Sequence, residues 1–215
     1  MKTLDWSLYL VTDRSLSRGR STENLVEAAI RGGATVVQYR EKNLSTRDMI
    51  EEAAAIAGIC RRLGALFIVN DRLDVALAVK ADGLHVGQDD MPANVARSLL
   101  GPEAILGVSA GSAEEAIRAE ADGADYIGAS PIFSTPTKTD AGPALGIAGL
   151  AAITASTTLP VIAIGGINAG NARSMIAAGA AGLAVVSAIV SADDPEVSAR
   201  DLRAIIEAAR RREWK

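Results

Sequence analysis

Short apolar runs that alternate with longer helical segments constrain this chain more than any other feature. Each run is followed by a loop and then by a segment with helical spacing, which is the pattern of repeated strand–helix units. A series of such units leaves few residues for a second layer, so it favours an α/β fold, a (β/α)₈ TIM barrel, over a doubly wound open sheet. We predict eight strands, at residues 7–11, 35–39, 66–69, 83–86, 105–108, 126–129, 161–164 and 183–186.

Polar and glycine residues mark the ends of the predicted helices. Glycine within residues 121–125, and in similar segments before the other even-numbered strands, can supply the left-handed residue that ends a helix. Side-chain oxygens can accept hydrogen bonds from the first turn of a helix. We expect such caps at Ser21, Ser45, Ser112, and Asn168 or Asn171. The whole chain, residues 1–215, is predicted to form one catalytic domain.

Composition narrows the class of ligand. Hydrophobic residues make up 49% of the chain, enough for a sizeable core, and the net charge of −4 comes from interspersed acidic and basic residues. This argues against a nucleic-acid-binding face or a membrane anchor. No secretory signal is visible in residues 1–12, and the lone Cys60 is expected to be a buried structural thiol. We expect a cytoplasmic protein that acts on small molecules, and the sequence also allows a homo-oligomer.

The loop after the sixth predicted strand gathers hydroxyl groups and one lysine. It includes Thr135, Pro136, Thr137 and Lys138, whose donors and positive charge suit an anion such as phosphate. The prolines limit the freedom of the loop before a ligand binds. Clusters of Ser, Thr and Pro are also typical of ordinary surface loops, so this segment by itself leaves both readings open.

A second group of polar residues follows the second predicted strand. Gln38, Arg40 and Lys42 alternate, so in an extended chain their side chains face one site. An amide and two cations at this spacing suit a polyanion such as pyrophosphate, since arginine can bind two oxygens at once. An ordinary charged strand end, with Glu41 paired to a neighbour, is the alternative.

Carboxylates follow the third and fourth predicted strands. Asp71 and Asp90 would form an oxygen-rich site of the kind that Mg²⁺ prefers, although each could instead cap a nearby helix. The only histidine, His85, lies inside the fourth strand and is interpreted as a satisfied core residue. Ser109 has no evident base to activate it, so we expect it to hydrogen-bond an anion.

Glycines after the seventh strand complete a second anion site. Backbone N–H groups after strands seven and eight form the usual phosphate site of this barrel, and here they would belong to Gly166, Val186 and Ser187. A monophosphate site beside a cationic site with carboxylates predicts two substrates and a transfer reaction.

Short motifs in a fixed order connect the chain to a known family. They are Gln38-Tyr39-Arg40-Glu41-Lys42, Val69-Asn70-Asp71-Arg72, His85-Val86-Gly87-Gln88-Asp89-Asp90, Gly107-Val108-Ser109, Thr135-Pro136-Thr137-Lys138 and Ile164-Gly165-Gly166-Ile167. Across nearly its whole length, the chain resembles the thiamine phosphate synthase family. The resemblance implies a Mg²⁺-dependent transferase of thiamine biosynthesis with a (β/α)₈ barrel. It would join 4-amino-2-methyl-5-(hydroxymethyl)pyrimidine diphosphate to a thiazole phosphate, with a carboxylated thiazole phosphate as another acceptor, and release pyrophosphate.

The resemblance also implies a role for each motif residue. Arg40, Lys42, Ser109 and Lys138 would be catalytic, and Asp71 and Asp90 would bind Mg²⁺. The pyrimidine diphosphate would contact Gln38, Tyr39, Arg40, Glu41, Lys42, Asn70, Ser109 and Lys138. The thiazole phosphate would contact Thr135, Pro136, Thr137, Gly166, Val186 and Ser187. Many relatives carry a histidine where this chain has Gly111, and no role above needs that side chain.

The reaction suits a dissociative route through a pyrimidine carbocation, since no protein nucleophile is in view and charge on the departing pyrophosphate can be neutralised. Two alternatives stay open. One is the thiazole tautomerase branch of the same barrel family, against which the pyrophosphate-binding residues argue. The other is a non-catalytic barrel that binds a phosphorylated ligand.

Overall fold

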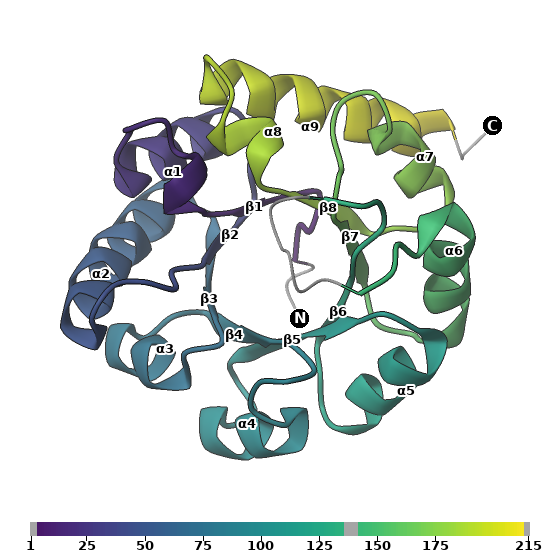
Figure 1. Ribbon diagram of the computed structural model, residues 1–215, viewed down its shortest axis with the longest axis horizontal. Helices are drawn as coiled ribbons and strands as arrows, with labels where there is room; N and C mark the ends of the chain where they lie inside the picture. The colour runs from purple at the N-terminus through teal and green to yellow at the C-terminus, as the bar shows by residue number, and fades with distance from the viewer. Residues whose placement is uncertain (1–3, 136–141, 213–215) are drawn as a thin grey trace.

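Eight parallel strands close into a barrel in chain order, and the helices form a ring around it (Figure 1). The computed structural model describes residues 4–135 and 142–212. The barrel closes where β1 pairs with both β2 and β8. The strands are β1 (Leu8–Val11), β2 (Val36–Tyr39), β3 (Leu66–Asn70), β4 (Gly83–Val86), β5 (Ile105–Ala110), β6 (Tyr126–Ala129), β7 (Val161–Ile164) and β8 (Gly182–Val185). The predicted single-domain (β/α)₈ barrel is therefore confirmed.

The helices follow the strands, with two additions to the simple alternation. A short 3₁₀ helix, η1 (Arg14–Leu16), follows β1, and two helices follow β8 instead of one. The last of these, α9, packs against α1, α7 and β1, so it covers the seam where the barrel closes. The helices are α1 (Thr22–Arg31), α2 (Thr46–Leu63), α3 (Leu73–Val79), α4 (Ala93–Leu100), α5 (Ala113–Ala121), α6 (Gly146–Ser156), α7 (Ala172–Ala177), α8 (Ser187–Val190) and α9 (Pro195–Arg212).

Three of the predicted helix caps are confirmed. The hydroxyls of Ser21, Ser45 and Ser112 accept hydrogen bonds from backbone N–H groups in the first turns of α1, α2 and α5. Asn171 stands at the N-cap of α7, but its side chain makes no cap bond. Its Oδ1 accepts from the N–H of Asn168 at 2.9 Å, so the amide braces the loop before the helix and the predicted capping role is wrong.

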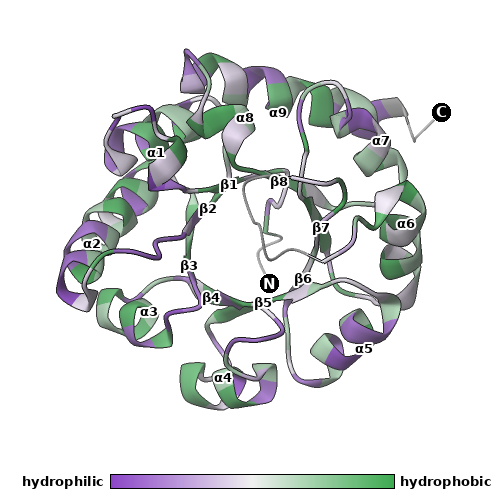
Figure 2. Cartoon of the chain, in the orientation of Figure 1, coloured by the Kyte–Doolittle hydropathy of each residue, from purple (hydrophilic) through white to green (hydrophobic). Residues whose placement is uncertain are grey.

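The core has two layers, because successive strand residues point alternately into the barrel and out toward the helices. The outer layer lies between strands and helices and includes the buried thiol of Cys60 on α2, as predicted. The inner layer fills the barrel and consists of Trp6, Tyr9, Val11, Val36, Ile68, Tyr126, Ile162 and Ala184. In Figure 2 the loops after β2, β3 and β4 are coloured as hydrophilic, so polar groups collect at the end of the barrel where those strands finish.

Candidate active site

Three adjoining cavities open at the carboxyl ends of the strands. Ser130 and Val186 line both the central cavity and the one beside β7 and β8, whereas Arg40, Asn70 and Ser109 line both the central cavity and the one beside β3 and β4. A ligand that spans all three would therefore be surrounded by residues from most strands. The central cavity also contains Tyr9, Thr12, Gln38, His85 and Tyr126.

The cavity beside β3 and β4 holds the predicted acidic pair. Asp71 lies against Asp90, and the Lys42 ammonium contacts Asp71 Oδ2 at 2.6 Å. Burial raises the pKa of Asp71, Lys42 lowers it and the Asp90 carboxylate raises it again, so the net shift is upward. Two carboxylates that repel each other in this way are a site where a cation is favourable.

Neither aspartate caps a helix, so that alternative is wrong. Arg72 is the N-cap residue of α3 and Pro92 that of α4, and neither helix has a side-chain cap bond. Asp90 instead accepts from the N–H of Gly87 at 2.8 Å, which closes the turn after β4. Asp71 adopts a left-handed backbone conformation, with φ of 59°. This strained conformation, uncommon outside glycine, turns the chain sharply just after Asn70.

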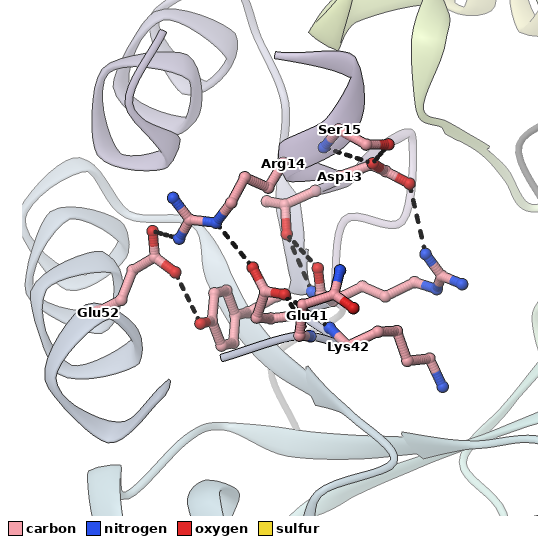
Figure 3. Close-up of polar contacts among 10 residues, drawn as sticks. Asp13, Arg14, Ser15, Glu41, Lys42 and Glu52 are labelled. Carbon is pink, nitrogen blue, oxygen red and sulfur yellow. Dashed lines mark hydrogen bonds and ion pairs between the residues drawn. The ribbon is translucent and has the colours of Figure 1, made fainter. Parts of the chain in front are cut away.

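Arg40 is held at the edge of the central cavity by residues from the loop after β1. Its N–H donates to Thr12 Oγ1 at 2.9 Å, and its guanidinium lies 3.4 Å from Asp13 Oδ2. Figure 3 shows Asp13 on this loop, next to Arg14 and Ser15. Because these contacts come from the loop after β1 and not from Arg40's own loop, the pairing of β1 with β2 in the barrel positions the guanidinium.

The side chains of Glu41 and Tyr39 point away from the cavities, and their expected contact with the pyrimidine diphosphate stays a prediction. Both carboxylate oxygens of Glu41 are used within the protein: one pairs with Arg14 at 2.9 Å and the other accepts from the N–H groups of Lys42 and Asn43, each at 2.8 Å. Tyr39 donates to Glu52 on α2 at 2.7 Å. Strand alternation explains the difference, since Gln38 and Arg40 face the cavity and Tyr39 and Glu41 therefore face outward.

Arg14 links this loop to α2. Its guanidinium bridges Glu41 and Glu52, with the contact to Glu52 at 2.6 Å, as Figure 3 shows. Burial alone would raise the pKa of Glu41, but the hydrogen bonds from Arg14 and two backbone N–H groups outweigh it, and the pKa is lowered. Glu41 is therefore a buried anion that holds the Lys42 backbone in place.

Glycines shape the third cavity, beside β7 and β8. Gly166 has φ of 68°, and a Cβ there would lie 2.8 Å from the Cβ of Phe133. Only glycine fits this position without strain. Its carbonyl accepts from Asn171 Nδ2 at 2.9 Å, which fixes the loop. Val186, Ser187 and Thr135 line the same cavity. The expected contacts of Pro136, Thr137 and Lys138 lie outside the described residues.

A chain of buried polar side chains forms the floor of the central cavity, and sequence patterns did not indicate it. His85 is buried, as predicted, with one ring nitrogen 2.8 Å from Tyr126 Oη and the other 2.9 Å from Ser109 Oγ. Yet it also lines two of the three cavities. Thr12, Asp13, Tyr9 and Tyr126 were missed because their partners lie far along the chain, and no local motif marks them.

The fold and these cavities define a (β/α)₈-barrel enzyme that acts on small-molecule substrates. The family model described as thiamine monophosphate synthase matches residues 8–189. The chain therefore belongs to the thiamine monophosphate synthase family, whose members are transferases of thiamine biosynthesis. Its activity, like its relatives', is the synthesis of thiamine phosphate.

The relatives are similar over nearly their full length. The thiamine-phosphate synthase of Chloroflexus aurantiacus is 59% identical over 203 residues, covering 94% of each chain. That of Moorella thermoacetica is 55% identical, covering 95% of this chain and 98% of the relative. A solved structure of thiamine phosphate pyrophosphorylase from Pyrococcus furiosus is 43% identical with a TM-score of 0.88, covering 96% of this chain and 98% of that one. None of the helices in residues 4–135 and 142–212 is long and apolar enough to cross a membrane.

Proposed function

We propose that the three cavities bind a pyrimidine diphosphate and a thiazole phosphate side by side and join them. The observation that carries this proposal is the continuity of the cavities. An acidic and cationic cavity is connected, through a mostly apolar central cavity, to a glycine-lined one. The diphosphate would lie near Arg40, Lys42 and Ser109, and the thiazole's phosphate near Gly166 and Ser187. The aminopyrimidine would occupy the central cavity.

Asp71 and Asp90 fit a magnesium ion. Their oxygens are hard ligands and they lie together. The pKa of Asp71 is raised first by burial and further by the neighbouring Asp90 carboxylate, and a cation between the two would relieve that repulsion. When bound there with diphosphate oxygens, Mg²⁺ would neutralise charge on the leaving group. Among the described residues no cluster of three or more acidic, His or Cys side chains forms a complete protein-only metal site, which agrees with substrate oxygens and water supplying the remaining ligands.

The chain's own residues would act by charge and position. The bond between the exocyclic CH₂ of the pyrimidine and the diphosphate oxygen breaks, and pyrophosphate leaves with the electron pair. The thiazole nitrogen then gives its lone pair to the CH₂ carbon, so a C–N bond forms and no proton is transferred. Arg40, Lys42 and Ser109 would donate hydrogen bonds to the departing oxygens. Each such preorganised donor lowers the activation free energy by about 3 kcal/mol. We place this reaction in the cytoplasm, where the buried thiol of Cys60 would stay reduced.

Coupled measurement of thiamine phosphate formation and pyrophosphate release tests the proposal. Asp71→Asn should lower kcat by roughly 100-fold or more with the fold intact. Asp74→Asn, which removes an exposed carboxylate in the first turn of α3 that pairs with Arg72 at the N-cap of the same helix, should retain the wild-type rate. A tautomerase would convert the thiazole without releasing pyrophosphate, and equal rates in both variants would contradict the assignment of the acidic pair.

A further inference from the structure

Five side chains form a continuous chain of hydrogen bonds across the inside of the barrel. Gln38 Nε2 donates to Tyr9 Oη at 2.9 Å, and the hydroxyls of Tyr9 and Tyr126 lie 2.7 Å apart. Tyr126 Oη lies 2.8 Å from His85 Nδ1, and His85 Nε2 lies 2.9 Å from Ser109 Oγ. These residues come from β2, β1, β6, β4 and β5, so the series exists only in the closed barrel. We call it the relay.

The barrel holds the relay rigidly. Tyr9 and Tyr126 are each 1% exposed, and Trp6 packs on the Tyr126 ring with centroids 4.8 Å apart. Two glycines make room for the rings. A Cβ at Gly107 would lie 2.1 Å from Tyr126 Cζ, and one at Gly128 would lie 3.0 Å from His85 Cε1. Larger residues at these positions would displace the rings, so the hydrogen-bond geometry is built into β5 and β6.

The direction of the hydrogen bonds follows from the first donor. An amide nitrogen only donates, so the Tyr9 oxygen accepts from Gln38. Among the described residues, the Tyr9 hydroxyl hydrogen-bonds Gln38 and Tyr126, so its proton points to Tyr126. The opposite order would leave the buried phenolic proton of Tyr9 without an acceptor, which is costly.

The same rule continues from Tyr126 to the cavity. Having accepted from Tyr9, Tyr126 donates to His85 Nδ1, so the ring carries its proton on Nε2. That proton is donated to Ser109 Oγ. Burial raises the pKa of both tyrosines, so their hydroxyls stay protonated. The Ser109 hydroxyl, which lines the central and the acidic cavities, is then left with its own proton to donate.

We propose that Gln38, Tyr9, Tyr126 and His85 act as positioning residues that make Ser109 a hydrogen-bond donor toward an anionic group in the cavity. With the relay reversed, Ser109 would donate to His85 and present lone pairs to that anion, which repel it. The anion rests on the proposed function, where it is a diphosphate oxygen. The direction of the hydrogen bonds in the relay is independent of the proposed function, because it is a property of the substrate-free protein.

His85 is the only histidine in the chain, so its tautomer can be read directly by long-range ¹H–¹⁵N correlation in histidine-labelled protein. At pH 8 and without substrate, the wild type should show the Nε2–H tautomer. Gln38→Glu places an acceptor in the position of the first donor and should convert His85 to the Nδ1–H tautomer. Gln88→Glu is the matched control. Gln88 donates to the backbone carbonyl of Ser109 at 2.7 Å, outside the relay, so this variant should keep Nε2–H.

Kinetics test whether the relay acts through Ser109. Ser109→Ala and Gln38→Glu should each lower kcat by roughly 100-fold. In the Ser109→Ala background, Gln38→Glu should lower kcat by far less than about 100-fold, because the donor that the relay positions is already gone and only the direct contact of Gln38 with the cavity is lost. An Nδ1–H tautomer in the wild type, or in the Gln88→Glu control, would overturn the relay, as would Nε2–H in Gln38→Glu or multiplied losses in the double variant. If the tautomers are as expected but the wild-type protein does not join the two substrates, the proposed function fails and the relay stands.

Discussion

Replacing Gly107 with alanine should destabilise the barrel strongly, because the added methyl group would overlap the Tyr126 ring. The Cβ would lie 2.1 Å from Tyr126 Cζ and 2.3 Å from both Cε1 and Oη. Carbon atoms in contact normally lie about 3.5–4.0 Å apart, so the ring must move by roughly 1.5 Å. The barrel interior has little room for this movement, since Trp6 packs on the ring and Tyr9 lies beside it.

Two costs add up. Overpacking a close-packed core costs about 1–3 kcal/mol. Moving the Tyr126 hydroxyl breaks its bonds to Tyr9 and His85 and leaves a buried polar group unsatisfied, which costs about 1–3 kcal/mol more. A total near 4 kcal/mol should lower Tm by roughly 8–16 °C in a protein of this size.

Calorimetry and urea unfolding followed by tryptophan fluorescence measure the change. Gly58→Ala is the control: Gly58 is exposed in the middle of α2, and no heavy atom lies within 4 Å of its added Cβ. Alanine there should stabilise the protein by about 0.5–1 kcal/mol through helix propensity. The two substitutions add the same methyl group and should therefore change Tm in opposite directions.

A second variant tests whether the loss of stability comes from overlap between the added methyl group and the Tyr126 ring. In the Gly107→Ala/Tyr126→Leu double variant the shorter side chain leaves space for the methyl group. Its loss of stability should be smaller than the sum of the single losses by at least about 1 kcal/mol. The reasoning would be refuted by a Gly107→Ala protein that melts within 2 °C of the wild type, or by strictly additive losses.

Other predictions concern the loops and the lone thiol. Glu52→Gln removes the ion pair with Arg14 and loosens the loop after β2, so steady-state kinetics should show the KM for the pyrimidine diphosphate rising about fivefold; an unchanged KM contradicts this. Gly166→Ala forces an alanine into a left-handed conformation against Phe133, so the KM for the thiazole phosphate should rise about 10-fold while the other substrate's KM is unaffected. Burial raises the pKa of Cys60 to about 12, so the thiol stays protonated at pH 8, and a thiol-reactive disulfide should label it only as the protein unfolds. Fast labelling of the native protein would show that Cys60 is accessible.

Local patterns were enough to predict the strands and most of the caps. Strand periodicity and helix capping depend on residues within a few positions of one another, so the sequence contains that information directly. The predicted ranges lie within two residues of the observed strands, and the caps at Ser21, Ser45 and Ser112 are confirmed. Asn171 shows the limit of this reasoning, because its side chain accepts a hydrogen bond from Asn168 in the preceding loop and not from the first turn of the helix.

The same local reasoning located residues that line the cavities but did not tell which side chains of a motif face them. Gln38, Arg40 and Asn70 line the cavities, as expected for polar residues at the carboxyl ends of strands. Tyr39 and Glu41 belong to the same motif, but strand alternation places their side chains on the outer face. A motif identifies a segment of chain, whereas the pleat decides which of its side chains reach the ligand.

What the sequence by itself determined is the repeated strand–helix unit and the polar residues that follow each strand. Only the tertiary structure decided which distant residues meet. Tyr9 and Tyr126 are 117 positions apart, yet their hydroxyls lie 2.7 Å from each other, because the closed barrel directs both side chains to its axis. Hydrogen bonds depend on distance and direction in space. The relay that ends at Ser109 and the ion pair between Asp13 and Arg40 therefore form only when the eight strands close into a barrel.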